Sequence, residues 1–266
     1  METDKPKNRN GLKMKGLLIS LLGAAFLVYY SVMSIVGAAR ETDRLIDKFN
    51  PEKDAVNRAD SAVYHDSAYV SMLKERAWLQ SKTIMAATDS IYLTIDLNDS
   101  IADIAINGVI VHSSPISRFR ISRVFKKGNE ASLNTFFSNP LSITSSVSTI
   151  RKEPLMIKMA PKDTSEYKPD VIPDTAHTQP VNFVLNMTDN VNIYFYQDDI
   201  EGLGDWLTRI MFDFRLRLSE TWRAVKSVAV LKVPEYHPYI KLYVSRADGR
   251  IIYRALPRKG QIGVLL

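Results

Sequence analysis

The chain of 266 residues carries 35 Lys and Arg against 29 Asp and Glu, a formal net charge of +6, and it contains no cysteine. Disulfide scaffolds, thiolate metal sites and cysteine nucleophiles all need that residue, so the composition excludes them. With 45% hydrophobic and 24% charged residues, the chain has the composition of a globular protein.

The first predicted element is an uncharged apolar run at residues 16–39, between Lys15 and Arg40. As an α-helix this run would be about 36 Å long, enough to cross a hydrocarbon core of about 30 Å. A cleaved signal sequence is the alternative, because small residues at 36–38 would permit cleavage, but the run is longer than a usual signal core. The sequence therefore predicts a transmembrane helix at residues 16–39.

The charges on either side of this run give only a weak indication of topology. Residues 1–15 contain five Lys or Arg, and the 15 residues after the run contain four. A short tail with five cations is nevertheless harder to export than a long C-terminal domain, whose own charges count little. We therefore expect a single-pass protein of the inner (cytoplasmic) membrane, with a cytoplasmic tail at 1–15 and the bulk of the chain extracytoplasmic.

A helical stalk is predicted at residues 40–88, with Asn50 as the N-cap and Pro51 at the first helical position of its main helix. Small apolar residues recur there at a spacing of seven, but polar residues interrupt the second seam of the repeat. Two interpretations follow. The helix either lies on its own domain or forms a coiled-coil stalk that pairs with another copy or a partner.

Residues 89–266 are predicted to form one domain, whose strands show the alternation of apolar and polar residues typical of half-buried sheets. Loops are expected at 128–148 and 160–180, which are rich in polar residues or proline. The predicted strands are Ser90–Leu97, Ile101–Val111 with a turn at Asn107-Gly108, Arg118–Lys127, Pro154–Met159, Val181–Leu185, Val191–Tyr196, Val228–Val233, Tyr239–Val244, Arg250–Leu256 and Ile262–Leu266. A further hairpin turn is expected at residues 247–249.

One long amphipathic helix interrupts these strands between Glu201 and Val228. Its apolar residues follow the 3, 4 spacing of a stripe that we expect to be buried against the sheet. The stripe comprises Leu203, Trp206, Leu207, Ile210, Met211, Phe214, Leu218, Trp222 and Val225. The predicted fold class is therefore α+β, a mainly antiparallel sheet with one amphipathic helix packed on it.

The sequence shows few signals of catalytic, metal-binding or nucleic-acid-binding sites. The four histidines, at 65, 112, 177 and 237, lie far apart in sequence, and the common phosphate-loop, dinucleotide, zinc-protease and serine-hydrolase motifs are missing. The tail contributes half of the net charge, so the remaining chain is too mildly basic to indicate nucleic-acid binding. We expect no cofactor, no metal, no nucleic-acid partner and no catalytic residue.

From Ser90, in the sequence SIYLTIDLND, the chain resembles the L,D-transpeptidase catalytic domains of cell-wall enzymes. In the late signatures of that family, Tyr194 stands here at a histidine position, and the segment His237–Leu242 carries Tyr239 where the family has its cysteine nucleophile. A phenol cannot replace a thiolate in attack on an amide. The resemblance implies a non-catalytic relative with a groove at Tyr194, His237, Tyr239 and Lys241.

The sequence thus predicts a membrane-anchored, extracytoplasmic binding or structural module of a cell envelope assembly. Its expected partners are envelope proteins or cell-wall material, and it can form a homo-oligomer. The alternative is an envelope hydrolase or transferase with an unrecognised Ser, Tyr or His site. That alternative requires His112 or His237 within about 3 Å of a hydroxyl or carboxylate.

Overall fold

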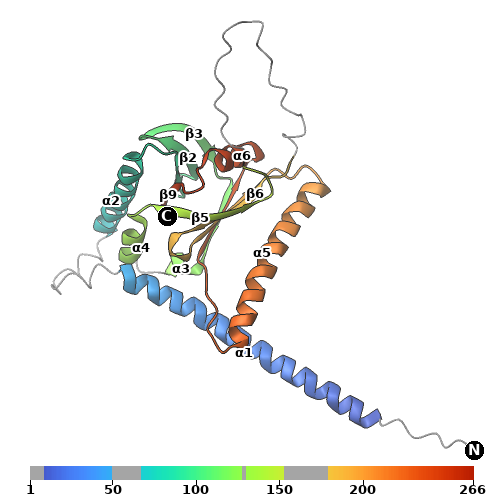
Figure 1. Ribbon diagram of the computed structural model, residues 1–266. Helices are drawn as coiled ribbons and strands as arrows, with labels where there is room; N and C mark the ends of the chain where they lie inside the picture. The colour runs from blue at the N-terminus through green and yellow to red at the C-terminus, as the bar shows by residue number, and fades with distance from the viewer. Residues whose placement is uncertain (1–8, 50–66, 128–129, 153–178) are drawn as a thin grey trace, which may run out of the picture. The chain divides into compact units, whose positions relative to one another are not determined.

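The computed structural model describes residues 9–49, 67–127, 130–152 and 179–266, and the fold is α+β, as predicted (Figure 1). The strands are β1 (Tyr92–Asp96), β2 (Ile101–Ile106), β3 (Val109–Pro115), β4 (Arg118–Ile121), β5 (Leu141–Ser148), β6 (Asn182–Met187), β7 (Asn192–Gln197), β8 (Tyr239–Val244) and β9 (Gln261–Leu265). The helices are α1 (Arg9–Phe49), α2 (Ser67–Ala86), α3 (Arg123–Lys127), α4 (Glu130–Phe137), α5 (Leu203–Ala229) and α6 (Arg246–Ala255), with a short 3-10 turn, η5, at Thr188–Asn190.

The strands form one nine-stranded sheet in the order β3-β2-β1-β9-β5-β6-β7-β8-β4. The pairs β1–β9 and β7–β8 are parallel and the other six pairs are antiparallel, so the prediction of a mainly antiparallel sheet is confirmed. Strand β5 joins the two halves of the sheet. Its first two residues pair with β9 and later ones pair with β6, with a register shift between Ile143 and Ser145.

The predicted turn between β2 and β3 is confirmed, and its two residues explain why it forms. Asn107 and Gly108 have backbone φ angles of 49° and 82°. Asparagine tolerates this left-handed region and glycine enters it without steric cost, so the pair suits a two-residue hairpin turn.

Helix α2 packs on the domain and lies beside α4 and β9. Met85 is fully buried, and a Cβ added to Gly263 would lie only 2.6 Å from the Cε atom of Met85. The missing side chain at Gly263 therefore lets α2 approach β9 closely. This supports the interpretation that the helix lies on its own domain, while the predicted N-cap Asn50 and first-position Pro51 fall outside the described residues.

Several predicted segments are wrong, because tertiary contacts override their local pattern. The predicted loop at 128–148 contains α4 and β5, and the predicted strand 118–127 ends at β4 and continues as α3. Aromatic contacts among Phe125, Phe136 and Phe137, with ring centroids 4.8 to 6.3 Å apart, join these two short helices. A cluster of this kind cannot be recognised from the polar composition of the segment.

The predicted turn at 247–249 and strand Arg250–Leu256 are instead helix α6. Ser245 is its N-cap, because the Ser245 Oγ atom accepts a hydrogen bond of 3.1 Å from the backbone N–H of Asp248. Ile252 and Leu256 are buried four residues apart, the spacing of a helix face. The predicted strand Val228–Val233 is also wrong, since its first two residues are the last residues of α5. The predicted strand Pro154–Met159 lies outside the described residues.

The chain forms two compact units, one of Met1–Glu41 with Arg217–Tyr236, the other of Thr42–Leu216 with His237–Leu266. Within α1, Ser20–Phe49 has a mean hydropathy of 1.9 over its most apolar window, which is only 6% buried. Of the helices in the described part of the chain, this one alone is long and apolar enough to cross a membrane. A signal sequence has the same properties.

Helix α5 is confirmed, but its predicted packing is wrong. Most of the apolar stripe expected to be buried is exposed, including Leu203, Met211 and Phe214. The neighbouring residues Phe212 and Leu216 pack against the sheet instead. The physical reason is that the sheet face beneath α5 is rich in tyrosine and needs polar partners, which the other side of the helix supplies.

Candidate binding surface on strands β7 and β8

Strands β7 and β8 place a group of aromatic and cationic side chains on one face of the sheet. The two strands pair in parallel, with Tyr194 opposite Lys241 and Tyr196 opposite Tyr243. Because alternate residues of a strand share a face, Tyr239 joins this group. We call Tyr194, Tyr196, Tyr239, Lys241 and Tyr243 the tyrosine–lysine surface.

Lys241 lies among three tyrosine rings of this surface. Its Nζ atom is 4.9 Å from the ring centroid of Tyr194, 5.3 Å from that of Tyr239 and 5.6 Å from that of Tyr196. Each distance is within the range of a cation–π interaction. Lys241 and Tyr239 are half-buried whereas Tyr194 is buried, so the surface is open to solvent only on the side of β8.

The N-terminal half of α5 covers the tyrosines of this surface. Phe212 packs with Tyr194 and Tyr196, and the Tyr196 hydroxyl donates a hydrogen bond of 2.5 Å to Oδ1 of Asp213. Burial first, and then this bond and the negative charge of Asp213, raise the pKa of Tyr196 far above its usual value of 10.0. Tyr196 is therefore a neutral donor at physiological pH.

Two arginines extend the positive charge of the surface. The Arg209 guanidinium lies 5.1 Å from the ring centroid of Tyr196 and 5.0 Å from that of Tyr243, and it donates a hydrogen bond of 3.2 Å to the Tyr243 hydroxyl. On β4, Arg118 stacks over Tyr243 at 4.5 Å and pairs with Asp198 at 2.7 Å. The hydrogen bond between Arg118 and Asp198 raises the pKa of Arg118 and lowers that of Asp198.

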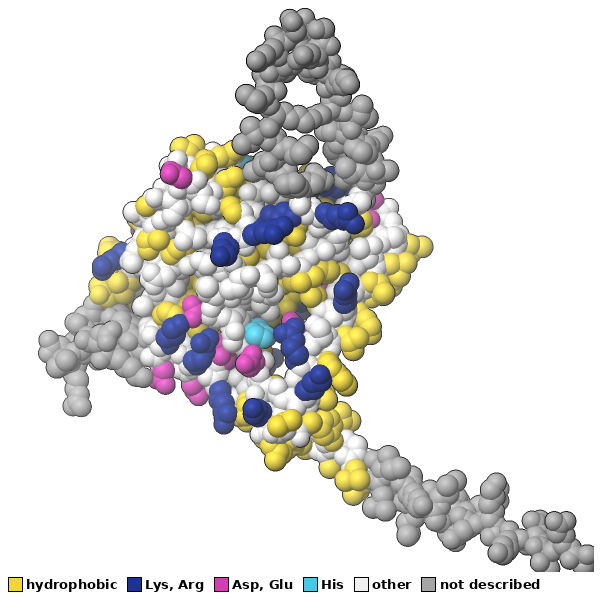
Figure 2. All heavy atoms as spheres, in the orientation of Figure 1, with side chains coloured by type: hydrophobic (Ala, Val, Ile, Leu, Met, Phe, Trp, Pro, Cys, Tyr) yellow, Lys and Arg dark blue, Asp and Glu magenta, His cyan; other side chains and the backbone are white. Residues whose placement is uncertain are grey.

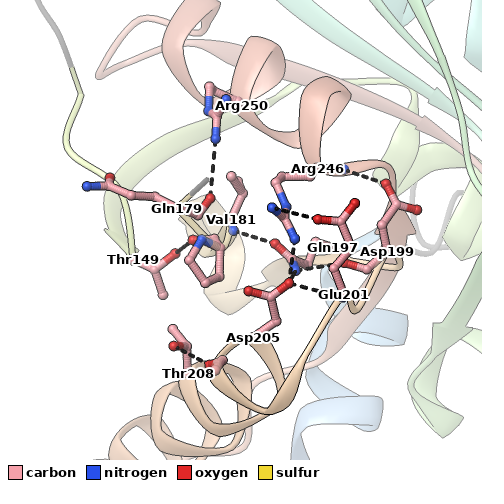
Figure 3. Close-up of polar contacts among 12 residues, drawn as sticks. Thr149, Gln179, Val181, Gln197, Asp199, Glu201, Asp205, Thr208, Arg246 and Arg250 are labelled. Carbon is pink, nitrogen blue, oxygen red and sulfur yellow. Dashed lines mark hydrogen bonds and ion pairs between the residues drawn. The ribbon is translucent and has the colours of Figure 1, made fainter. Parts of the chain in front are cut away.

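A polar cluster fixes the start of α5 beside this surface (Figure 3). Arg246 at the start of α6 pairs with Asp205 in the first turn of α5, and the side chains of both are largely buried. Gln197 at the end of β7 donates a hydrogen bond of 3.2 Å to Oδ2 of Asp205 and accepts one of 2.8 Å from the backbone N–H of Val181. These contacts join β7, α5 and α6 at the start of α5. They thereby determine which side of the helix faces the sheet.

The structure brings together three of the four residues predicted from the sequence. Tyr194, Tyr239 and Lys241 are neighbours on β7 and β8, and the two segments that carried the family resemblance therefore lie side by side. His237 lies in the loop before β8 and is half-buried, and it forms no hydrogen bond or ion pair with the residues that the structure describes.

Four further residues of this site were not predicted from the sequence: Tyr196, Tyr243, Arg209 and Asp213. The period of two along each strand was sufficient to find the tyrosines, because Tyr196 follows Tyr194 and Tyr243 follows Lys241 on the same face. Arg209 and Asp213 also had a signal, a spacing of four on one side of α5. The apolar stripe on the other side of the helix hid that signal.

Among the described residues, His112 has a carboxylate partner. Its Nε2 atom lies 2.9 Å from Oδ1 of Asp248, whose other oxygen accepts a hydrogen bond of 2.6 Å from the Ser245 hydroxyl. The carboxylate thus lies between the serine and the histidine, whereas a Ser-His-Asp triad needs the imidazole in that place. The same Ser245 and Asp248 cap α6, which is a sufficient structural role. His65 and His177 are outside the described residues.

Comparison of the chain with protein-family models, curated proteins and solved structures gives no match.

Proposed function

We propose that this protein is a membrane-anchored, extracytoplasmic binding or structural module of a cell envelope. In this proposal α1 crosses the inner membrane with the N-terminus in the cytoplasm. The α+β domain then binds an envelope protein or cell-wall material through the tyrosine–lysine surface.

The observation that carries the proposal is the exposure of the apolar part of α1. Its most apolar window is only 6% buried, so the protein itself provides little cover for these side chains. Exposed helical leucines, isoleucines and phenylalanines over that length are unfavourable in water and suit a hydrocarbon environment.

The tyrosine–lysine surface supports the binding role. Half-buried tyrosines beside Lys241, with the exposed Arg118 nearby, provide rigid aromatic area and positive charge. A ligand with carboxylates, such as a cell-wall peptide or an acidic segment of a protein, matches this chemistry. The resemblance to L,D-transpeptidases, which remains a prediction, favours the cell-wall peptide.

The anchor is tested by alkaline extraction of native membranes and by cysteine labelling of the cysteine-free chain. A single cysteine introduced at exposed Lys259 should react with a membrane-impermeant maleimide in cells whose outer layer is permeabilised. Release at alkaline pH, or shortening of the chain at its N-terminus by signal cleavage, would contradict the anchor.

Binding is tested by co-sedimentation of the protein with isolated cell wall and by crosslinking in native membranes. Lys241→Met keeps the length of the side chain and removes its charge, so we expect at least a tenfold loss of binding, or about 1.4 kcal/mol. Lys259→Met removes an exposed cation elsewhere and is the matched control. Equal binding by the two variants would contradict the proposal that the tyrosine–lysine surface binds the ligand.

The alternative, an envelope hydrolase or transferase, is favoured by the pairing of His112 with Asp248. It predicts turnover of cell-wall peptide or ester substrates by the full-length protein. Such turnover should disappear in His112→Gln while the helix content stays unchanged.

A further inference from the structure

The side of α5 that faces away from the sheet is unusually apolar. Within the first half of the helix, six large side chains are exposed, and together they define the outer face of α5: Leu203, Trp206, Leu207, Ile210, Met211 and Phe214. Met211 is 64% exposed and Trp206 is 49% exposed. Figure 2 shows hydrophobic side chains along this outer side of the helix.

This exposure is built into the fold and does not result from loose packing. Asp205, Arg209 and Asp213 all make polar contacts with the sheet or α6, and Phe212 between them is only 8% exposed. Since an α-helix turns about 100° per residue, a helix that presents these residues inward must present the apolar stripe outward. Burying the outer face against the same sheet would break every one of those contacts.

The charges that α5 shows to its surroundings are mainly positive. Arg215, Arg217, Arg223 and Lys226 are exposed, whereas Asp205 and Asp213 are engaged with the domain. These cations follow the outer face along the same helix, and a helix that combines exposed Trp, Phe and Leu with exposed cations is typical of the interface of an anionic membrane.

The segment that follows α5 contacts α1, the helix proposed to cross the membrane. The segment after α5 packs on α1 within one compact unit, where a Cβ added to Gly37 would lie 2.6 Å from the carbonyl oxygen of Pro234. Gly37 lies just before Arg40, where the apolar run of α1 ends. Val230 and Leu231, between α5 and this contact, are 67% and 77% exposed. The end of α5 is therefore only a few residues from Pro234, which contacts α1 near the expected boundary between lipid and water.

We propose that the outer face of α5 inserts into the lipid interface of a bilayer with anionic headgroups, so that the protein has a second, peripheral contact with the membrane. This inference rests on the proposed anchoring by α1. It adds that the domain is held against the lipid surface by α5, which would fix the direction in which the tyrosine–lysine surface faces.

Insertion of α5 into lipid can be tested by intrinsic tryptophan fluorescence. The chain has three tryptophans, of which Trp206 and Trp222 lie on α5 and Trp78 lies on α2. The full-length variant with Trp78→Phe and Trp222→Phe, which leaves Trp206, is reconstituted in vesicles of phosphatidylglycerol and phosphatidylcholine. Replacing the phosphatidylcholine by its brominated form should quench Trp206 roughly twofold, since interfacial helices lie about 5–10 Å deep. Acrylamide in the water should quench it weakly.

Two matched variants separate insertion from general proximity to the membrane. Met211→Glu places a charge on the outer face and should abolish most of the quenching by brominated lipid. Ile251→Glu places the same charge on an exposed apolar position of α6 and should leave the quenching unchanged. Neither position is buried, so both variants are expected to fold.

Strong quenching of Trp206 by acrylamide and none by brominated lipid would overturn the inference. Protection from both quenchers would overturn it as well, because the face would then be covered by a second copy or another protein. In either case, a chain that still resists alkaline extraction leaves the proposed function standing. Release by alkaline extraction would reject the anchor itself.

Discussion

At the scale of single residues, the contact between Tyr196 and Asp213 couples the sheet to α5. The hydroxyl is removed from water by Phe212 and neighbouring rings, and the Asp213 carboxylate accepts a hydrogen bond of 2.5 Å from it. A hydrogen bond to a charged acceptor contributes more to stability than a neutral one, and losing the donor leaves the carboxylate poorly solvated. The hydrogen bond therefore stabilises both the buried hydroxyl of Tyr196 and the carboxylate of Asp213.

We predict that Tyr196→Phe lowers the free energy of unfolding by about 1–3 kcal/mol at neutral pH. Because the folded state raises the pKa of Tyr196, the stability from the neutral phenol is complete below about pH 10 and is lost as the pH rises above that value. Urea unfolding at pH 7 and pH 10.5 should therefore show a smaller alkaline loss in the variant.

Tyr243→Phe is the control for this prediction. It removes the acceptor of one hydrogen bond from Arg209 but keeps the stacked ring, so a smaller loss at neutral pH is expected. Equal alkaline losses in wild type and Tyr196→Phe would show that Tyr196 does not titrate differently on folding.

At the scale of elements, α5 is the helix whose two sides have opposite roles. Its inward side carries the polar partners of a tyrosine-rich sheet face, and its outward side carries the large apolar residues. Hydrophobic residues usually mark the buried side of a surface helix. Here the composition of the sheet face decides the orientation, because buried phenol groups need hydrogen-bond partners.

Two phenylalanines of α5, two positions apart, test this assignment. Phe212→Ala removes a buried ring and should cost about 3–5 kcal/mol, while Phe214→Ala, at an exposed site, should change stability by about 0.5 kcal/mol or less. Chemical unfolding of the full-length protein in a mild detergent, followed by circular dichroism, measures both. A larger cost for Phe214→Ala would mean that the helix is rotated.

At the scale of the whole molecule, α1 belongs to a compact unit with the segment 217–236, and the two approach closely at Gly37. The nearest atom to an added Cβ is a backbone oxygen, which cannot move away as the end of a side chain can. A glycine on a helix surface has no side chain to keep a neighbouring backbone at a distance.

We predict that Gly37→Ala separates the segment around Pro234 from α1, at a cost of about 1–3 kcal/mol, and speeds tryptic cleavage at Lys232 severalfold. Gly23→Ala is the matched control in the same helix, because a Cβ there would meet no atom within 4 Å. Equal cleavage rates in the two variants would contradict the close contact at Gly37.

Much of the sheet could be predicted from the sequence because local patterns determine it. Strands β1, β2, β6, β7 and β8 show alternation of apolar and polar residues along the sequence, and the Asn107-Gly108 turn indicates the β2–β3 hairpin. The short helices α3, α4 and α6 could not, since they depend on phenylalanine contacts and on a cap at Ser245.

The candidate site was predicted in part. Tyr194, Tyr239 and Lys241 came from a resemblance between two short segments, and their contact depends on the parallel pairing of β7 with β8 across more than 40 intervening residues. Arg209 and Asp213 could not be assigned to the site without knowing which side of α5 meets the sheet.

The apolar run of α1, the α+β class and the existence of α5 as an amphipathic helix follow from the sequence alone, because each depends on composition or periodicity along the chain. The outward orientation of the apolar side of α5 depends on packing against the sheet and could not be read from the sequence. A sequence pattern shows that a helix has two unlike sides, but the surface that the helix meets determines which side is buried.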